Sequence, residues 1–183
     1  MNEPNQTPEP GRRGFLVKSA AVGLGAAAGI GPALAGLRVI LDPLRRESGG
    51  SGAALLVARL GSLPADGVPR RFQVLADRVD AWNTYKNIPV GAVYLRRTAD
   101  NKVTALNASC PHAGCSVSFA GDKGQFICPC HDSLFTVEGG IANASSPSPR
   151  ALDALDVEVR NETEVWVKFR NYQPGHKEQI PVT

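Results

Sequence analysis

The chain has 183 residues, of which 43% are hydrophobic and 20% charged, and its formal net charge is +3. This length accommodates one compact domain with an appendage and excludes a large multidomain enzyme. The basic residues form no concentrated stripe of the kind typical of nucleic-acid binders, so a nucleic-acid partner is not expected. All four cysteines and two of the three histidines fall between Cys110 and His131, which marks this stretch as the candidate site.

An apolar stretch near the N-terminus predicts a membrane anchor. Residues 1–14 form a polar tail that contains an arginine pair, and Ala20–Leu37 follow without a charge. An uncharged run of this length is just long enough to cross a bilayer as a helix. The alternative is a buried core helix, but a core helix of a soluble domain keeps one polar face, which this run lacks. We expect a cytoplasmic tail over residues 1–14 and a single transmembrane signal anchor over residues 15–44.

The start of this anchor also indicates a route of export. Arg12-Arg13-Gly14-Phe15-Leu16 resembles the core of a twin-arginine signal. Such signals export folded proteins, which implies a head on the outer, periplasmic side of a bacterial cytoplasmic membrane. Ala33-Leu34-Ala35 resembles a cleavage site, so removal of the segment is the alternative. The apolar Val39-Ile40-Leu41 and the basic Arg45-Arg46 beyond it favour a retained anchor.

A glycine- and serine-rich segment follows the anchor. Ser48-Gly49-Gly50-Ser51-Gly52 has almost no side chains to pack, and such runs behave as flexible coil. We interpret residues 45–54 as a hinge that lets a head domain, residues 55–183, move relative to its membrane foot. Five extended residues already span more than ~10 Å. The alternative is a passive spacer.

The rest of the chain has the composition of a β domain. Short runs rich in Val, Leu and aromatic residues alternate with Pro, Gly, Asn and Asp turns, and no long helical pattern follows the anchor. Many short strands at this spacing argue for an antiparallel sandwich or a small barrel. The predicted strands are Leu55–Leu60, Arg71–Leu75, Ala92–Arg96, Val103–Asn107, Gln125–Cys128, Leu155–Val159 and Val165–Phe169, with a hairpin turn near Asn161-Glu162 between the last two.

Two short boxes hold the soft ligands: box one is Cys110-Pro111-His112-Ala113-Gly114-Cys115, and box two is Cys128-Pro129-Cys130-His131-Asp132-Ser133. Two structural disulfides would suit an even cysteine count in an exported protein but leave both histidines unexplained. A Cys₂His₂ zinc site would leave one superfluous cysteine in each box. A [2Fe–2S] centre in which two histidines replace two cysteines on one iron accounts for all six residues. The third histidine, His176, lies in a polar tail and is expected to have no metal role.

The boxes resemble those of the Rieske iron–sulfur family, in particular its disulfide-containing branch in quinol-oxidising cytochrome bc-type complexes. The resemblance implies a mainly β protein, in which an antiparallel β-sandwich head with an inserted cluster-binding part, about residues 108–150, is attached to one N-terminal transmembrane helix. The cofactor that it implies is a [2Fe–2S] cluster. The implied roles are one iron on Cys110 and Cys128, the other iron on His112 and His131, and an inter-box disulfide between Cys115 and Cys130.

The same resemblance implies a function in electron transfer. The chain would be the iron–sulfur subunit of a quinol:cytochrome c oxidoreductase, a membrane-anchored subunit of a dimeric complex. It would take an electron from a quinol, expected to be menaquinol, at a cytochrome b subunit and pass it to a cytochrome c-type acceptor. His131 would accept the hydrogen bond of the quinol hydroxyl, with His112 nearby, so that proton release accompanies electron transfer.

Two further members of the family are alternatives. The small subunit of arsenite oxidase is also exported by twin arginines and carries the disulfide, but it receives electrons from a molybdenum subunit. A soluble Rieske ferredoxin that serves an oxygenase lacks the Cys115/Cys130 pair and has no anchor.

Residues after the second histidine bear on the reduction potential that we expect for the cluster. In the family, a Ser two positions after it and a Tyr four positions after it donate hydrogen bonds to sulfur atoms of the cluster site. Ser133 matches, whereas Phe135 lacks the hydroxyl. Losing a hydrogen bond to sulfur lowers the reduction potential, so we expect a low-potential cluster suited to menaquinol. Asp132 stands where the family usually has Gly, and Ser146-Pro147-Ser148-Pro149 resembles the loop that covers the cluster.

Overall fold

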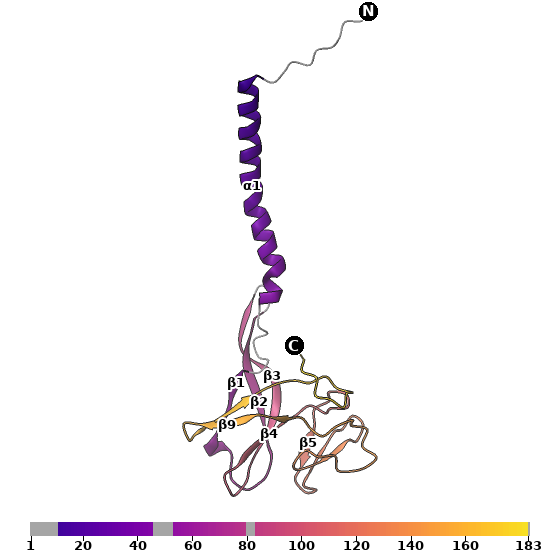
Figure 1. Cartoon of the computed structure of the whole chain (residues 1–183). Coiled ribbons are helices and arrows are strands. Elements are labelled where there is room, and N and C mark those ends of the chain that lie inside the picture. Colours follow the sequence, from indigo (N-terminus) through magenta and orange to yellow (C-terminus); the bar gives the residue numbers. More distant parts are fainter. Residues whose placement is uncertain (1–10, 46–52, 80–82, 183) are drawn as a thin grey trace, which may run out of the picture. The chain divides into compact units, whose positions relative to one another are not determined.

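The computed structural model describes residues 11–45, 53–79 and 83–182 (Figure 1). The chain divides into two compact units, Met1–Glu47 and Ser48–Thr183. The predicted hinge over residues 45–54 falls mostly on residues 46–52, outside the described residues, and stays a prediction.

The first unit contains one long helix, α1 (Arg12–Arg45). Its segment Arg12–Leu41 is long and apolar enough to cross a membrane, and no part of its apolar window is buried in the structure. Large apolar side chains such as Leu24 and Ile40 are exposed along it. In a bilayer these side chains would lie in hydrocarbon, and every backbone group within the helix keeps a partner inside the helix. The expected N-terminal apolar helix is therefore present.

The second unit consists of three antiparallel sheets, and its described residues contain one short 3-10 helix, Leu60–Ser62. The first sheet has the order β1 (Ala54–Arg59), β10 (Glu164–Lys168), β9 (Val157–Arg160). The second has the order β2 (Arg70–Val79), β3 (Thr84–Arg97), β4 (Val103–Asn107), β8 (Ala154–Leu155). The third has the order β5 (Ser118–Ala120), β6 (Gln125–Ile127), β7 (Leu134–Thr136).

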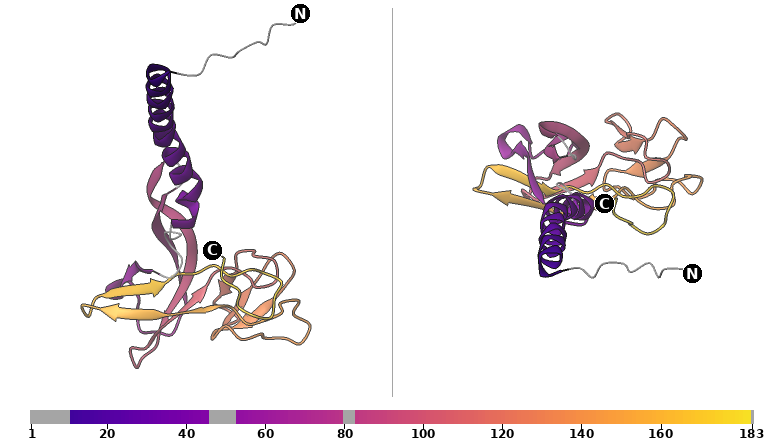
Figure 2. Two further views of the ribbon diagram at one scale, coloured as in Figure 1. Left: turned by 45° about the horizontal axis from the view of Figure 1, so that its top comes forward. Right: turned by 90° about the horizontal axis from the view of Figure 1, so that it is seen from above.

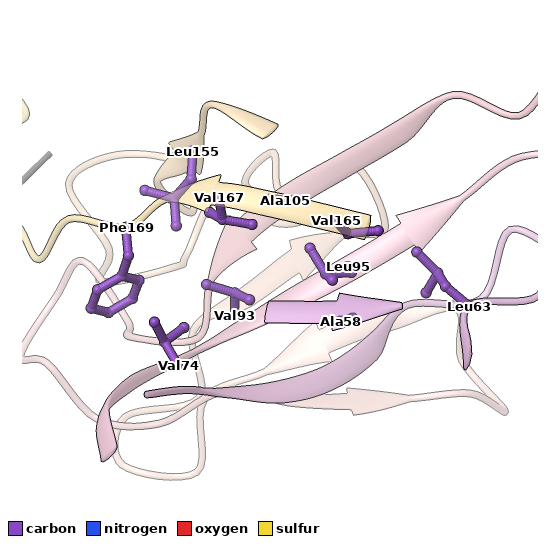
Figure 3. Close-up of a cluster of buried hydrophobic side chains, with 10 residues drawn as sticks. All are labelled: Ala58, Leu63, Val74, Val93, Leu95, Ala105, Leu155, Val165, Val167 and Phe169. Atoms are coloured by element: carbon purple, nitrogen blue, oxygen red, sulfur yellow. The ribbon is translucent and has the colours of Figure 1, made fainter. Parts of the chain in front are cut away.

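The first two sheets form a sandwich around an aliphatic core. Strand β10 alternates as a strand with one buried face must, with Val165 and Val167 buried and Trp166 between them only half-buried. From the other sheet, Val93 and Leu95 of β3 meet these valines without exposed area (Figure 3). The predicted mainly β, antiparallel sandwich is thus confirmed.

Strand β3 is buried on both faces at Val93–Leu95, where it contributes to two cores. Val93 and Leu95 point into the sandwich core, whereas Tyr94 between them belongs to a second apolar cluster. In that cluster the Tyr94 ring meets Phe126 of β6 edge to face at 4.8 Å, and the Tyr94 hydroxyl donates to the Val117 carbonyl at 3.1 Å. The third sheet therefore packs on the face of β3 that points away from the sandwich core. It lies at the end of the unit opposite the β9–β10 turn (Figures 1 and 2).

Most predicted strands are confirmed, with differences that have local causes. The turn at Asn161-Glu162 has both residues at positive φ, 50° and 58°, as a tight hairpin turn with the twist of its strands requires. The single strand expected over Leu155–Val159 is two strands separated at Asp156. Strands β5 and β7 were not predicted, because three residues are too few for a periodic pattern.

Candidate metal centre

Box one is a tight turn that begins just after β4. Buried Asn107, the last residue of β4, accepts a hydrogen bond from the Ser109 N–H at 2.9 Å and donates to the Arg170 carbonyl at 2.8 Å. The Cys110 N–H then donates to the Cys115 carbonyl at 2.7 Å, and the Gly114 N–H donates back to the Cys110 carbonyl at 2.8 Å. The two ends of the box therefore meet, and the intervening His112 is carried on the turn.

Box two is the loop of the β6–β7 hairpin. The Cys128 N–H donates to the Ser133 carbonyl at 2.9 Å, which closes the loop on its own base. Within it Asp132 has a φ of 53°, in the left-handed region that Gly adopts freely and that Asp tolerates better than most residues. The exchange of Gly for Asp at this position is thus compatible with the loop.

A disulfide between Cys115 and Cys130 links the two boxes, with their Cα atoms 6.5 Å apart. Cys110 and Cys128 are free and buried. Interpretation of the four cysteines as two structural disulfides is therefore wrong. Sulfur atoms of Cys115, Cys128 and Cys130 all lie within 4.8 Å of one another, so the disulfide borders directly on the free thiol of Cys128.

The two free thiols occupy an apolar, water-poor environment. Cys110 and Cys128 are each 1% exposed and belong to the second apolar cluster. Burial raises the pKa of the Cys110 thiol, and the adjacent Cys128 raises it further, although the His112 N–H acts in the opposite direction. Two adjacent buried thiolates repel each other and are unfavourable unless a cation compensates their charge. A bound metal ion supplies that positive charge in a metal-thiolate site.

The two imidazoles, one from each box, lie against each other. Their ring centroids are 4.7 Å apart and the ring planes meet at 80°. His131 is exposed, whereas His112 is half-buried. The arrangement gives one side of the site to solvent or a partner molecule and the other to the protein.

Unpartnered polar atoms test whether a cluster fits here. In the described part of the chain, three buried side-chain polar atoms have no hydrogen-bond partner, and two of them, His112 Nδ1 and Ser133 Oγ, belong to the two boxes. Buried polar groups are almost always paired, because an unpaired one costs about 1–3 kcal/mol. A metal–sulfide group between the boxes would give the imidazole nitrogen a metal and the hydroxyl an acceptor, so the residues present fit a [2Fe–2S] cluster.

Phe135 is a buried residue of the second apolar cluster. It has no exposed area and pairs in register with Phe126 across the β6–β7 ladder. It belongs to the same buried cluster as Cys110 and Cys128. A tyrosine ring here would carry its hydroxyl within the cluster that holds these thiols, and the phenylalanine supplies no such donor.

Sequence reasoning missed contacts outside the boxes. Arg150, directly after the Ser146–Pro149 loop, forms a bidentate ion pair with Asp153 and donates to the carbonyl oxygens of two residues in the segment that follows β10. That segment contains His176, whose side chain is exposed. The one available signal was an Arg and an Asp three residues apart behind a Pro-rich loop, which by itself is common in surface turns.

Comparisons with known proteins agree with this site. The Rieske [2Fe–2S] domain matches residues 54–161. The chain is 30% identical over 154 residues to the "Menaquinol:cytochrome c reductase iron-sulfur subunit" of Geobacillus thermodenitrificans, covering 82% of this chain and 86% of that protein. It is 28% identical over 138 residues to the "Cytochrome b6-f complex iron-sulfur subunit" of Chlorobaculum thiosulfatiphilum, covering 75% of this chain and 66% of that one.

Among solved structures, the chain is similar to the cyanobacterial plasma membrane Rieske protein PetC3 from Synechocystis PCC 6803. The TM-score is 0.44 at 24% sequence identity, and the alignment covers 63% of this chain and 99% of that one. The domain match includes both boxes and more than half of the chain. The chain belongs to the Rieske [2Fe–2S] family and is similar to the iron–sulfur subunits of menaquinol:cytochrome c reductases and cytochrome b6-f complexes.

Proposed function

We propose that the two boxes hold the [2Fe–2S] cluster through four side chains. Cys110 and Cys128 ligate one iron as thiolates, and His112 and His131 ligate the other through one ring nitrogen each. When bound, the cluster supplies a one-electron redox centre, and its histidine ligands raise the potential above that of a four-cysteine cluster. The buried free thiols and the unpartnered His112 Nδ1 and Ser133 Oγ support this ligand set.

We further propose that the chain is the electron-transfer subunit of a membrane complex that oxidises menaquinol. The observation that carries this choice is the 30% identity, over 82% of this chain, to a menaquinol:cytochrome c reductase iron–sulfur subunit. The electron comes from menaquinol bound at a cytochrome b subunit and goes to a cytochrome c-type acceptor. The complex in this proposal is a dimer.

In this proposal His131 contacts the quinol. Its imidazole is exposed, and the half-buried His112 lies beside it at 4.7 Å between ring centroids. With Nδ1 turned to the metal, as the buried Nδ1 of His112 suggests for the pair, Nε2 of His131 is the nitrogen left free, and in its unprotonated form it would accept the hydrogen bond of the quinol hydroxyl. The proton therefore leaves along the same contact as the electron.

The anchor determines where this reaction takes place. Arg12-Arg13 lies at the start of α1, where a twin-arginine signal would be read before export. We propose that α1 is retained as a single span of the bacterial cytoplasmic membrane and that the head works on its periplasmic side. The apolar, unburied segment Arg12–Leu41 supports the anchor.

Purification of the native complex from membranes tests the function. We expect the chain to co-purify with haem b and a c-type cytochrome, and the complex to reduce cytochrome c with a menaquinol analogue as donor. A complex with a molybdopterin subunit and no cytochrome b would instead support the arsenite oxidase alternative. A colourless preparation with bound zinc would contradict the cluster itself, because zinc sites have no visible absorption.

A further inference from the structure

The segment that follows β10, residues 170–182, folds back on itself and contacts box one. The Gln173 N–H donates to the Ile180 carbonyl at 2.8 Å, and the Val182 N–H donates to the Asn171 carbonyl at 2.9 Å, which closes the segment into a loop. Near the turn of this loop, the Gly175 N–H donates to the Pro111 carbonyl at 2.8 Å. Pro111 immediately precedes His112. We call residues 170–182 the clamp segment.

The clamp segment packs against box one at van der Waals distance, and its contacting residue has a backbone conformation that favours glycine. A Cβ atom placed on Gly175 would lie 3.9 Å from the carbonyl oxygen of His112, and Gly175 has a φ of 81°. On the other side of the same turn, a Cβ atom on Gly114 would lie 3.9 Å from Pro174. The clamp segment thus meets the box on both sides of His112.

The guanidinium group of Arg150 binds the middle of the clamp segment. Arg150 Nη1 donates to the carbonyl oxygens of Gln173 at 3.3 Å and His176 at 2.5 Å, and its Nη2 donates to Gln173 as well at 3.3 Å. These two carbonyl groups flank Pro174-Gly175, so Arg150 fixes the part of the segment that bonds to Pro111. The planar, five-donor guanidinium suits several acceptors at once, which an ammonium group does not.

Asp153 aims the guanidinium at these carbonyl groups. The pair is bidentate, with bonds of 2.8 and 2.9 Å, and the two side chains are only 9% and 4% exposed. Gln179 of the clamp segment also donates to Asp153, at 2.9 Å. Burial and geometry make this pair unlike an exposed ion pair, because loss of one partner leaves the other charge buried and unpaired.

The same arginine is the residue that follows the loop expected to cover the cluster. It directly follows Ser146–Pro149, and the buried Ser148 hydroxyl donates to its carbonyl oxygen at 2.8 Å. Arg150 therefore connects that loop, the clamp segment and, through Gly175, the backbone next to His112. The disulfide ties down Cys115 at the far end of box one, and this connection holds the near end.

We propose that Arg150 is a positioning residue for the [2Fe–2S] site: through the clamp segment it fixes the Pro111–His112 backbone and so the orientation of the His112 imidazole. The proposal rests on the ligand set proposed above. Ligand orientation influences the electronic structure of a metal centre, so a shift of this backbone alters the cluster's spectrum and potential as well as its retention.

The test compares Arg150→Ala and Arg150→Lys with the wild type in the full-length, membrane-bound protein. We expect Arg150→Ala to shift the EPR g-values of the reduced cluster and its midpoint potential, and to speed amide hydrogen exchange at Gly175. Arg150→Lys should recover part of the shift, since it restores the charge but not the fork of donors. The matched control is Arg160→Ala, which removes an exposed arginine paired to Glu158 on β9 and should leave both readouts unchanged.

A backbone variant keeps the test decisive if Arg150→Ala fails to fold. Gly175→Ala leaves the charges intact but strains a residue at φ 81°, and it should produce the same direction of spectral shift. Its control is Gly67→Ala, at φ 75° in an open loop with no atom within 4 Å of the new Cβ. Wild-type spectrum and potential in both Arg150→Ala and Gly175→Ala, with only a lower unfolding temperature, would overturn the positioning role. Absence of a Rieske-type signal in the wild type would instead overturn the ligand set, and the positioning role with it.

Discussion

Individual side chains around the boxes set the redox properties that we expect. Phe135 is fully buried in the cluster of side chains that contains Cys110 and Cys128, at the position where a tyrosine would offer a hydroxyl. Hydrogen bonds to the sulfur atoms favour the reduced, more negative state. Their absence at this position agrees with a donor of low potential such as menaquinol.

Replacing Phe135 with Tyr should raise the midpoint potential. One added hydrogen bond worth about 1 kcal/mol in favour of the reduced state corresponds to roughly 40 mV for a one-electron couple. EPR-monitored redox titration measures the change. Phe119→Tyr, which adds the same hydroxyl to a ring on β5 that packs on Phe126, is the control and should leave the potential unchanged. A potential in Phe135→Tyr at or below that of the wild type would contradict the account of Phe135.

The Cys115–Cys130 disulfide should contribute both stability and cluster retention. The bond spans 15 residues, and closing a loop of this size in the unfolded chain is worth about 3 kcal/mol. The double variant Cys115→Ser/Cys130→Ser should lose a comparable free energy of unfolding in chemical denaturation and lose its visible absorption faster. Thiol reduction of the wild-type protein is the matched treatment. Unchanged retention after both would count against a structural role for the disulfide.

At the scale of elements, β3 links the sandwich to the metal centre. Its residues Val93 and Leu95 face one core and Tyr94 faces the other, so a shift of this strand would disturb the packing of both cores. Near the start of its buried part, Gly91 meets Phe169 so closely that an added Cβ would lie 2.3 Å from the ring. The side chain of Phe169 is 3% exposed and has little room to move.

Gly91→Ala should therefore destabilise the head by overpacking, at a cost of about 1–3 kcal/mol. Chemical denaturation followed by tryptophan fluorescence measures the loss. Gly121→Ala is the control, because no atom lies within 4 Å of its added Cβ, and it should be close to neutral. Equal stability of the two variants would mean that β3 and Phe169 are packed less tightly than the structure indicates.

At the scale of the whole molecule, the predicted hinge connects an anchor helix to an electron-carrying head. A head that must visit a cytochrome b subunit and then a c-type acceptor needs a connection that bends, and Ser48–Gly52 has the composition for it. These residues lie outside the described part of the chain, so the prediction rests on sequence.

Replacing Ser48–Gly52 with five prolines should slow quinol-dependent cytochrome c reduction, because polyproline is a stiff, extended spacer. The EPR spectrum should stay that of the wild type. A five-residue Gly/Ser shuffle of the same length is the control and should retain full turnover. Full turnover in the polyproline variant would refute the moving head.

Features carried by short contiguous segments were predictable from the sequence. The anchor follows from an uncharged run, the boxes from residue types at fixed spacing, and the β9–β10 turn from Asn161-Glu162. Such signals depend on local chemistry, so they are readable without knowing what else packs nearby. Strands β5 and β7 were not predictable from the sequence. Each has three residues, too few for a periodic hydrophobic pattern, and each is defined by its pairing with β6.

The sequence by itself determined the chemistry of this protein, whereas the tertiary structure decided how that chemistry is held. Residue spacing, together with the resemblance to the Rieske family that it carries, implies two thiolates, two imidazoles and a disulfide. Only the folded chain brings the rings of His112 and His131 to 4.7 Å between centroids and buries Tyr94 and Phe135 in the cluster that contains Cys110 and Cys128. It also joins Arg150 to a segment 23 to 26 residues further along. The physical reason is that ligand identity is a property of side chains, whereas burial and long-range hydrogen bonds depend on the approach of segments that no local pattern connects.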